Sequence, residues 1–202
     1  MRYFISDYGF GWVFKPLPKS EEEIHEITRI MKPSQKFLKG QAKEEFFKQD
    51  AEEFEIIHLA THGILEEKQP LYSRIILAQD DDPAEDGFLQ TFEIFNMDLK
   101  ADLVVLSACE TGLGELSMGE GLIGLTRAFL YAGVQSVIVS LWSVEESTSQ
   151  LMKHFYQNLK DGMNKTEALR QAKIKLIHTR EEGLSYAHPF LWAPFVLVGD
   201  WK

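Results

Sequence analysis

The sequence is poor in cysteine, in long apolar runs and in basic residues. Its 202 residues contain one cysteine, which excludes an internal disulfide and any zinc site built mainly from cysteine ligands. No apolar run reaches the roughly 18 residues of a membrane-spanning helix. The first twenty residues lack the apolar core of a signal peptide. We therefore expect a cytoplasmic protein of a reducing compartment, without contact to a membrane.

Positive charge is scarce as well. The 31 acidic residues outnumber the 21 basic residues and give a formal net charge of −10. A protein that binds a nucleic-acid duplex needs a basic face to displace counterions, so this balance argues against direct DNA or RNA binding. The composition is 45% hydrophobic and 26% charged, as in an ordinary globular chain, and the length favours one domain over residues 1–202.

Expected strands and helices alternate along the chain. Ser20 and Glu23 have the spacing of a capping box, and the isoleucines that follow predict a helix there. Strands are expected at 54–60, 73–78, 102–107, 135–141 and 190–198, and further helices at 42–49, 91–95, 117–131, 143–159 and 164–177. This order predicts an α/β fold with a mostly parallel sheet and helices on both of its faces.

Three segments are expected to lie outside this framework. Residues 1–15 are rich in aromatic side chains and contain Gly9 and Gly11, which predicts an edge hairpin or edge strand, or a docking segment for a partner. The acidic stretch 80–86 is interpreted as a solvated loop, and residues 178–188 as a loose surface connection.

Reactive side chains follow two of the expected strands. Ligands of open parallel sheets bind beyond the carboxyl ends of the strands, where His62 and Cys109 lie. If the two strands are neighbours, the imidazole can take the proton of the thiol and create a nucleophile. The backbone N–H groups of Gly63 and Cys109 can then form an oxyanion hole. The alternative is that Cys109 is a buried small hydrophobic residue, as a lone strand-end cysteine often is.

Two other patterns are interpreted as structural. Residues 119–124 spell G-x-G-x-x-G, but about eleven residues separate them from the preceding strand, and Glu120 would place negative charge beside a pyrophosphate. We therefore expect these glycines to let a helix pack closely against the sheet. His58 and His62 lie on a strand and its exit without a third ligand, so no metal site is expected.

Four motifs together resemble a known family: HLATHG at 58–63, LVVLSACETGLG at 103–114, GEGLIGLTRAFLYAGVQSVIVSLWSV at 119–144 and PFLWAPFVLVGD at 189–200. They look like the CHAT domain, a family of caspase-like cysteine peptidases related to separase and often fused to tetratricopeptide repeats. The resemblance implies a caspase-like three-layer sandwich and a catalytic dyad of His62 and Cys109 that needs no cofactor. Glu110 follows the cysteine where caspases carry Arg-Gly, so caspase-style aspartate specificity is not implied.

The resemblance also implies a substrate-binding segment. Ser140, Leu141, Trp142 and Ser143 are expected to bind an extended peptide as an added strand. The next two acids, Glu145 and Glu146, have two interpretations. They attract a basic residue at the cleavage position, or they only stabilise the start of a helix, where the helix dipole favours negative charge.

We therefore expect a cysteine endopeptidase that hydrolyses a protein or peptide substrate through an acyl-enzyme. A fused repeat domain or a separate partner protein is expected to gate its activity. Two alternatives stay open on the sequence alone: a non-proteolytic interaction or signalling module with the same fold, and acyl transfer by the same dyad on a non-peptide amide.

Overall fold

The computed structural model describes residues 2–5, 17–79, 85–107, 109–110, 120–142, 145–181 and 184–202. The strands are β1 (Arg2–Ile5), β2 (Gln35–Leu38), β3 (Ile56–Leu59), β4 (His62–Ile64), β5 (Arg74–Ile76), β6 (Phe88–Gln90), β7 (Leu103–Leu106), β8 (Cys109–Glu110), β9 (Ser136–Ser140), β10 (Arg180–Glu181), β11 (Leu184–Ser185) and β12 (Phe195–Gly199). The helices are α1 (Pro18–Ile30), α2 (Glu44–Asp50), α3 (Thr91–Ile94), α4 (Glu120–Tyr131), α5 (Glu145–Lys160), α6 (Lys165–His178) and α7 (Pro189–Trp192).

Six strands form the main sheet in the order β12-β9-β7-β3-β1-β2. All neighbouring strands are parallel except β12, which runs antiparallel to β9 and closes one edge. The central strands are short apolar runs, and all four residues of β7 are buried, as expected for a strand covered on both faces. The mostly parallel sheet predicted from the sequence is confirmed.

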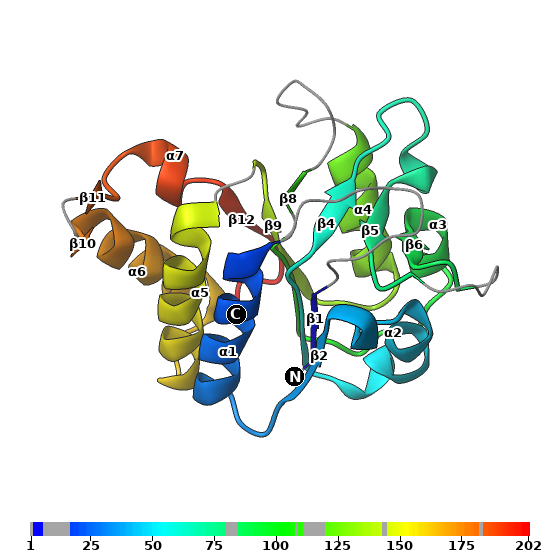
Figure 1. Ribbon diagram of the computed structural model, residues 1–202, viewed down its shortest axis with the longest axis horizontal. Coiled ribbons are helices and arrows are strands. Elements are labelled where there is room, and N and C mark those ends of the chain that lie inside the picture. The colour runs from blue at the N-terminus through cyan, green and yellow to red at the C-terminus, as the bar shows by residue number, and fades with distance from the viewer. Residues whose placement is uncertain are drawn as a thin grey trace.

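Helices cover both faces of this sheet (Figure 1). On one face α1, α5 and α6 pack around the fully buried Phe155 and Tyr156. On the other face α2 and α4 pack around Phe47 and Phe129. The chain therefore forms a three-layer α/β sandwich, as expected. Within the described ranges, the search for a helix long and apolar enough to span a bilayer finds none.

A second, four-stranded sheet has the order β6-β5-β4-β8. Its strands are two or three residues long, and it contains both His62 in β4 and Cys109 in β8. The sequence analysis placed these residues after strands of the main sheet and did not predict that they begin strands of their own. Strands this short carry too few residues for an alternating pattern, so only tertiary pairing reveals them.

Two predictions near the N-terminus are wrong. Strand β1 does not lie at an edge, because it pairs with β3 on one side and with β2 on the other. The half-exposed β2 takes the edge instead. Helix α1 begins at Pro18, with Leu17 as its N-cap and without a side-chain cap bond, so Ser20 and Glu23 form no capping box. The rest of the aromatic segment, residues 6–16, lies outside the described residues.

Other local predictions meet mixed outcomes. Helix α6 follows Asn164, as expected for a helix over 164–177, and the Asn164 side chain accepts a hydrogen bond from the Glu167 backbone N–H at 2.9 Å. The connection 178–188 contains the two-stranded ribbon of β10 and β11, which pair antiparallel, so it is more ordered than expected. The expected helix starts at Ser117 and Ser143 lie outside the described residues.

The glycines of helix α4 permit a close contact. A Cβ on Gly121 would lie 3.0 Å from the Ser73 hydroxyl and 3.1 Å from Leu65 Cβ. A Cβ on Gly124 would lie 3.1 Å from Pro70 Cβ. These glycines therefore serve helix packing, as the sequence analysis expected, although the contacted segment lies between β4 and β5 rather than in the main sheet.

Candidate functional site

His62 and Cys109 are paired residues of neighbouring strands. Strand β4 runs parallel to β8 (Figure 1). In the register of this pair the Cα of His62 lies opposite that of Cys109. Adjacent strands lie about 4.8 Å apart, so the two residues start their side chains within reach of each other. Both short strands continue from neighbours in the main sheet, since β3 leads to β4 and β7 leads to β8. The side chain of His62 is 2% exposed, and that of Cys109 lies outside the described residues.

Gly63 lies inside the second sheet. It pairs with Glu110 of β8 on one side and with Ile75 of β5 on the other. The preceding residue, Thr61, is fully buried and donates a hydrogen bond from its hydroxyl to the Ile76 carbonyl. These contacts fix the backbone beside His62. An oxyanion role for the Gly63 and Cys109 N–H groups stays a prediction.

The expected substrate segment continues from the end of β9. The Leu141 N–H donates to the Pro194 carbonyl at 3.0 Å, on the β12 side. Backbone groups of successive strand residues point to opposite edges, so those of Ser140 are directed toward the β7 side. The Ser140 hydroxyl donates to the Trp142 carbonyl at 2.7 Å and stabilises the bend.

Trp142 is held from the C-terminal part of the chain. Its indole N–H donates to the Phe190 carbonyl at 2.9 Å, and its ring stacks on the Phe190 ring with centroids 6.0 Å apart. Ser143 and the side chains of Glu145 and Glu146 lie outside the described residues. A peptide-binding role of the segment stays a prediction.

A buried polar network lies beneath the two short strands. Its members, which we call the Glu23 network, are Glu23 of α1, His58 of β3, Ser107 after β7 and Tyr156 of α5. His58 Nε2 lies 3.0 Å from Glu23 Oε1, and its Nδ1 lies 2.9 Å from the Tyr156 hydroxyl. The Ser107 hydroxyl donates to Glu23 Oε2 at 3.3 Å. The imidazole of His58 thus lies between the carboxyl group of Glu23, at ion-pair distance, and the hydroxyl of Tyr156, at hydrogen-bond distance.

The Glu23 network joins the two strands that lead to the candidate dyad. Its His58 precedes His62 by four residues, and its Ser107 precedes Cys109 by two. The sequence analysis missed this network because it assigned Glu23 to a helix cap. A signal was present, since Glu23 lies four residues before the buried Ile27 and therefore shares its helix face.

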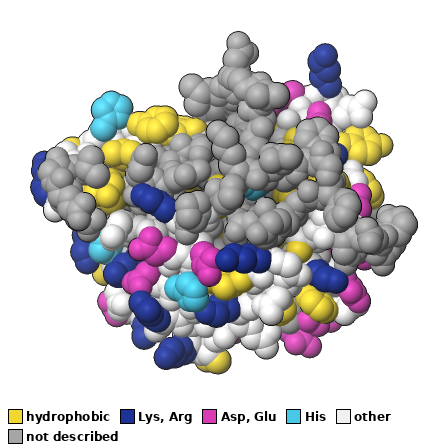
Figure 2. Space-filling model, viewed as in Figure 1, with side chains coloured by type: hydrophobic (Ala, Val, Ile, Leu, Met, Phe, Trp, Pro, Cys, Tyr) yellow, Lys and Arg dark blue, Asp and Glu magenta, His cyan; other side chains and the backbone are white. Residues whose placement is uncertain are grey.

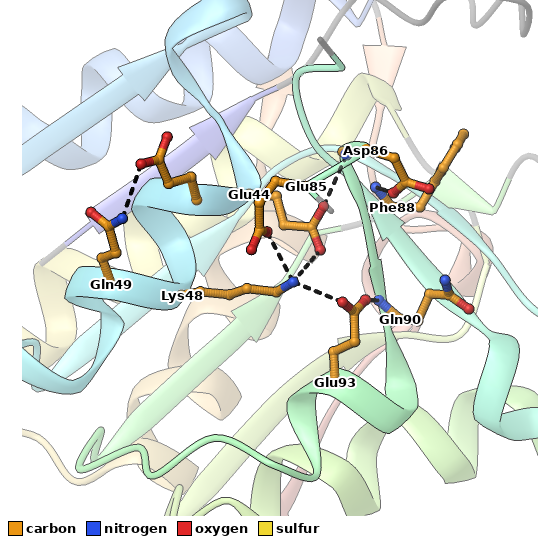
Figure 3. Close-up of polar contacts among 10 residues, drawn as sticks. Glu44, Lys48, Gln49, Glu85, Asp86, Phe88, Gln90 and Glu93 are labelled. Atoms are coloured by element: carbon orange, nitrogen blue, oxygen red, sulfur yellow. Dashed lines mark hydrogen bonds and ion pairs between the residues drawn. The ribbon is translucent and has the colours of Figure 1, made fainter. Parts of the chain in front are cut away.

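A second, partly buried group of charges lies on the opposite face of the main sheet. This Lys48 cluster consists of Lys48 and Glu44 of α2, Glu85, and Glu93 of α3 (Figure 3). Lys48 Nζ lies 2.9 Å from Glu44, 2.9 Å from Glu85 and 2.7 Å from Glu93. The expected solvated loop at 80–86 is therefore wrong at Glu85, which is ion-paired, and residues 80–84 lie outside the described residues.

Burial has the largest effect on the pKa of the Glu44 carboxyl group. It raises the pKa of the Glu44 carboxyl to about 7, against the opposing hydrogen bond from Lys48. Burial alone would lower the pKa of Lys48, but its hydrogen bonds to Glu93, Glu44 and Glu85 outweigh that effect and raise it. The Gly87 N–H donates to Glu44 at 2.9 Å, so the cluster fixes α2 to the start of β6.

His25 and His154 differ in how far they are exposed. His25 lies at the surface, with its Nδ1 3.0 Å from Lys36 Nζ. His154 of α5 is partly buried. Burial, together with the positive charges of Lys175 and Lys153, lowers the pKa of His154 to about 4.

Charges of both signs are interspersed over the described part of the face shown in Figure 2. Among the described residues, the search for three or more His, Cys, Asp or Glu side chains grouped to hold a metal ion finds none.

Two solved structures identify the class of fold to which this chain belongs. The separase–securin complex of Saccharomyces cerevisiae matches with a TM-score of 0.60 and 12% identity, over 98% of this chain and 12% of that chain. Gingipain R, titled an Arg-specific cysteine proteinase, matches with a TM-score of 0.59 and 10% identity, over 99% of this chain and 46% of that chain. The fold is therefore that of the caspase-like cysteine peptidases.

Within this class of fold, the chain can be assigned to one family. The model of the CHAT domain matches residues 7–200, and the chain belongs to the CHAT domain family. Tetratricopeptide repeat protein 28 of Mus musculus and of Homo sapiens are 28% and 27% identical to it over 221 residues. The alignments cover 94% of this chain and 9% of each relative, so the chain spans a small part of these repeat proteins.

Proposed function

We propose that the chain is a cysteine endopeptidase domain that cleaves peptide bonds with Cys109 as nucleophile and His62 as general base. One observation carries the proposal: His62 and Cys109 are opposite residues of two adjacent parallel strands. The pairing brings together the only cysteine of the chain and an imidazole, the two groups that thiol peptidases require. Membership in a family with the caspase-like fold supports the same reaction.

The reaction uses two half-steps. His62 takes the thiol proton, and the thiolate attacks the scissile carbonyl while the N–H groups of Gly63 and Cys109 stabilise the oxyanion. Collapse breaks the C–N bond, the imidazolium protonates the leaving amine, and a thioester remains on Cys109. His62 then takes a proton from water, the resulting hydroxide attacks the thioester, and the thiolate leaves with release of the carboxylic acid product.

Activity is proposed to be gated by a fused repeat domain or by a partner protein. The support is that the curated relatives carry tetratricopeptide repeats in their name and that this chain matches only 9% of their length. The nucleophile is a free thiol, so we propose that the protein works in the reducing cytoplasm.

The proposed function is tested by peptide-library cleavage with three purified proteins. Wild type, Cys109→Ala and His62→Ala are incubated with the library, and products are identified by mass spectrometry. His25→Ala is the matched control, because His25 is a surface histidine 37 residues away from the candidate dyad in sequence. We expect wild type and His25→Ala to cleave the same bonds, and both dyad variants to lose at least about 10³-fold in kcat/KM.

Two results would contradict the proposal. Cleavage by Cys109→Ala at the wild-type rate excludes the thiol as nucleophile. Absence of cleavage by the wild type, together with no thioester or alkylated adduct on Cys109, favours the non-proteolytic module with the same fold.

A further inference from the structure

A small pocket opens between the candidate dyad and the end of β9. Five leucines line it together with Gly63 and Ser140, and its volume is about 30 Å³. Gly63 follows His62, and Leu106 precedes Cys109 by three residues. Ser140 and Leu141 form the opposite wall, at the end of the strand that neighbours β7. The pocket is therefore bounded by both parts of the proposed active site, the dyad strands and the substrate segment.

The lining of the pocket is apolar. Leu106 and Leu125 are 2% and 3% exposed and belong to the core between the main sheet and α4. The only side-chain heteroatom of the described lining is the Ser140 hydroxyl, which already donates to the Trp142 carbonyl. A carboxylate, ammonium or guanidinium group that entered would lose its hydration without gaining a charged partner from these residues, and burial of an unpaired charge is strongly unfavourable.

The pocket is also narrow. A single water molecule needs at least about 10–15 Å³ of the same kind of space, so an opening of about 30 Å³ accepts a few carbon atoms. Helix α4, which supplies Leu122 and Leu125, already packs closely on the segment after β4, since a Cβ on Gly121 would lie 3.1 Å from Leu65 Cβ. An aromatic ring therefore does not fit unless a leucine is displaced.

The end of β9 determines which group of a substrate reaches the pocket. A peptide that pairs with the Ser140 edge of β9 lies between that strand and Cys109. Such a peptide passes Gly63 and Leu141, which both line the pocket.

We propose that this pocket receives the side chain of the residue whose carbonyl Cys109 attacks, and that it selects an uncharged aliphatic side chain of at most four carbons. The inference rests on the proposed function and adds the substrate class to it. It differs from the interpretation of Glu145 and Glu146 as acids that attract a basic residue at the same position. It also separates this chain from gingipain R, which is named as an Arg-specific cysteine proteinase.

The test compares peptides that differ only in this residue. Wild type and Cys109→Ala are given substrates with Ala, Val, Leu, Phe, Arg, Lys or Asp at the cleavage position, and kcat/KM is measured for each. Peptidyl acyloxymethyl ketones with the same residues are used in parallel, because intact mass reports alkylation of the single cysteine directly. We expect Ala, Val or Leu to exceed each charged residue and Phe by at least tenfold, since small differences in an apolar pocket are worth about 10- to 200-fold.

Two pocket variants sharpen the test. Leu65→Asp introduces a negative charge into the lining, and we expect it to lower the ratio of aliphatic to basic substrates at least tenfold. Leu71→Asp is the matched control, because Leu71 is 52% exposed and does not line the pocket, and its preference should equal that of the wild type. Leu122→Phe narrows the pocket with an apolar group, and we expect it to shift the preference from leucine toward alanine. This second variant keeps the inference testable if Leu65→Asp fails to fold.

The outcomes separate the inference from the proposed function. Cleavage that depends on Cys109 but prefers Arg, Lys, Asp or Phe overturns the inference alone. An unchanged preference in both folded pocket variants also overturns it. Cleavage that does not depend on Cys109, or a cysteine that no ketone labels, overturns the proposed function and the substrate class with it.

Discussion

The two faces of the main sheet bury charge in different ways. On one face the Glu23 network places the imidazole of His58 and the hydroxyl of Ser107 beside a single carboxyl group, and the Tyr156 hydroxyl contacts that imidazole. On the other face the Lys48 cluster places three carboxyl groups around one ammonium group. The Glu23 side chain is 3% exposed, whereas that of Lys48 is 23% exposed.

This difference indicates two separate roles. The Glu23 network connects α1 and α5 to the strands that carry the candidate dyad, so a change in it is expected to reach Cys109. The Lys48 cluster connects α2 to α3 and β6, at the far edge of the second sheet, so a change in it is expected to alter stability with little effect on the thiol. The predictions below test this comparison.

The largest effect is expected for Glu23→Ala. Removing one member of a buried ion-paired group leaves its partners without compensation, which typically lowers the free energy of unfolding by about 3–5 kcal/mol. We expect a melting temperature lower by roughly 10 °C and a changed alkylation rate of Cys109. The control is Glu22→Ala at the adjacent exposed position, and equal melting temperatures for the two variants would contradict the role of the Glu23 network.

A smaller loss is expected for Lys48→Met. The variant leaves three carboxyl groups without their shared donor, but the partial exposure of Lys48 lets water replace some of the contacts. We expect the free energy of unfolding to fall by about 2 kcal/mol without a change in the alkylation rate of Cys109. Lys100→Met is the control, since the Lys100 side chain is 71% exposed and its ion pair is long, at 3.9 Å. A large change in thiol reactivity in Lys48→Met would show that the two regions are coupled.

Glu44 and His154, on opposite faces of the main sheet, are expected to change the pH dependence of the free energy of unfolding in opposite directions. Glu44 has a pKa of about 7 in the folded chain against an ordinary 4.5, so the folded state binds more protons between these values. Its contribution to the free energy of unfolding therefore rises as the pH falls from 7 to 4.5. His154 has a pKa of about 4 against 6.5, so the unfolded state binds more protons, and its contribution falls as the pH falls through that range.

Two single variants expose these opposing contributions, each worth at most about 1.4 kcal/mol per unit of pKa shift. In Glu44→Gln the contribution of His154 remains, so stability should fall more steeply than in the wild type between pH 6.5 and 4.5. In His154→Gln the contribution of Glu44 remains, so the free energy of unfolding should rise as the pH falls from 6.5 to 4.5. Denaturant unfolding at pH 4.5, 5.5 and 6.5 measures both slopes, with Glu45→Gln as an exposed control. Identical slopes in all variants would refute the assignment.

The smallest effect on stability is expected for Ser107→Ala. The variant removes one 3.3 Å hydrogen bond to Glu23, so the free energy of unfolding should fall by only about 1 kcal/mol. Because Ser107 lies two residues before Cys109, we expect the alkylation rate of the thiol to change at least twofold despite this small loss. A thiol rate equal to that of the wild type would limit the Glu23 network to a structural role.

The parts of the fold that could be predicted from the sequence are those with strong local signals. The apolar runs that became β3, β7 and β9 have few other stable environments than the interior of a parallel sheet, and Asn164 has a side chain suited to its cap. Strands β4 and β8 are too short for such a signal, and the position of β1 depends on pairing with residues more than thirty positions away.

The residues of the candidate site also differ in whether they could be predicted from the sequence. His62 and Cys109 could be selected because strand ends in parallel sheets collect reactive side chains. The Glu23 network could not, because it joins residues that are up to 133 positions apart (Glu23 and Tyr156) and because Glu23 also fits a local cap pattern. The pocket beside Gly63 likewise depends on α4 packing next to the end of β9, which no single segment encodes.

The central claim is that His62 sets the reactivity of Cys109, and the pH profile of thiol alkylation tests it most directly. Iodoacetamide reacts with the thiolate, and the chain has one cysteine, so the rate in wild type, His62→Ala and His25→Ala reports this thiol alone. We predict that wild type and His25→Ala react well below pH 8, and that His62→Ala reacts only as the pH approaches the ordinary thiol pKa of about 8.5. Superimposable profiles for the wild type and His62→Ala would contradict the account.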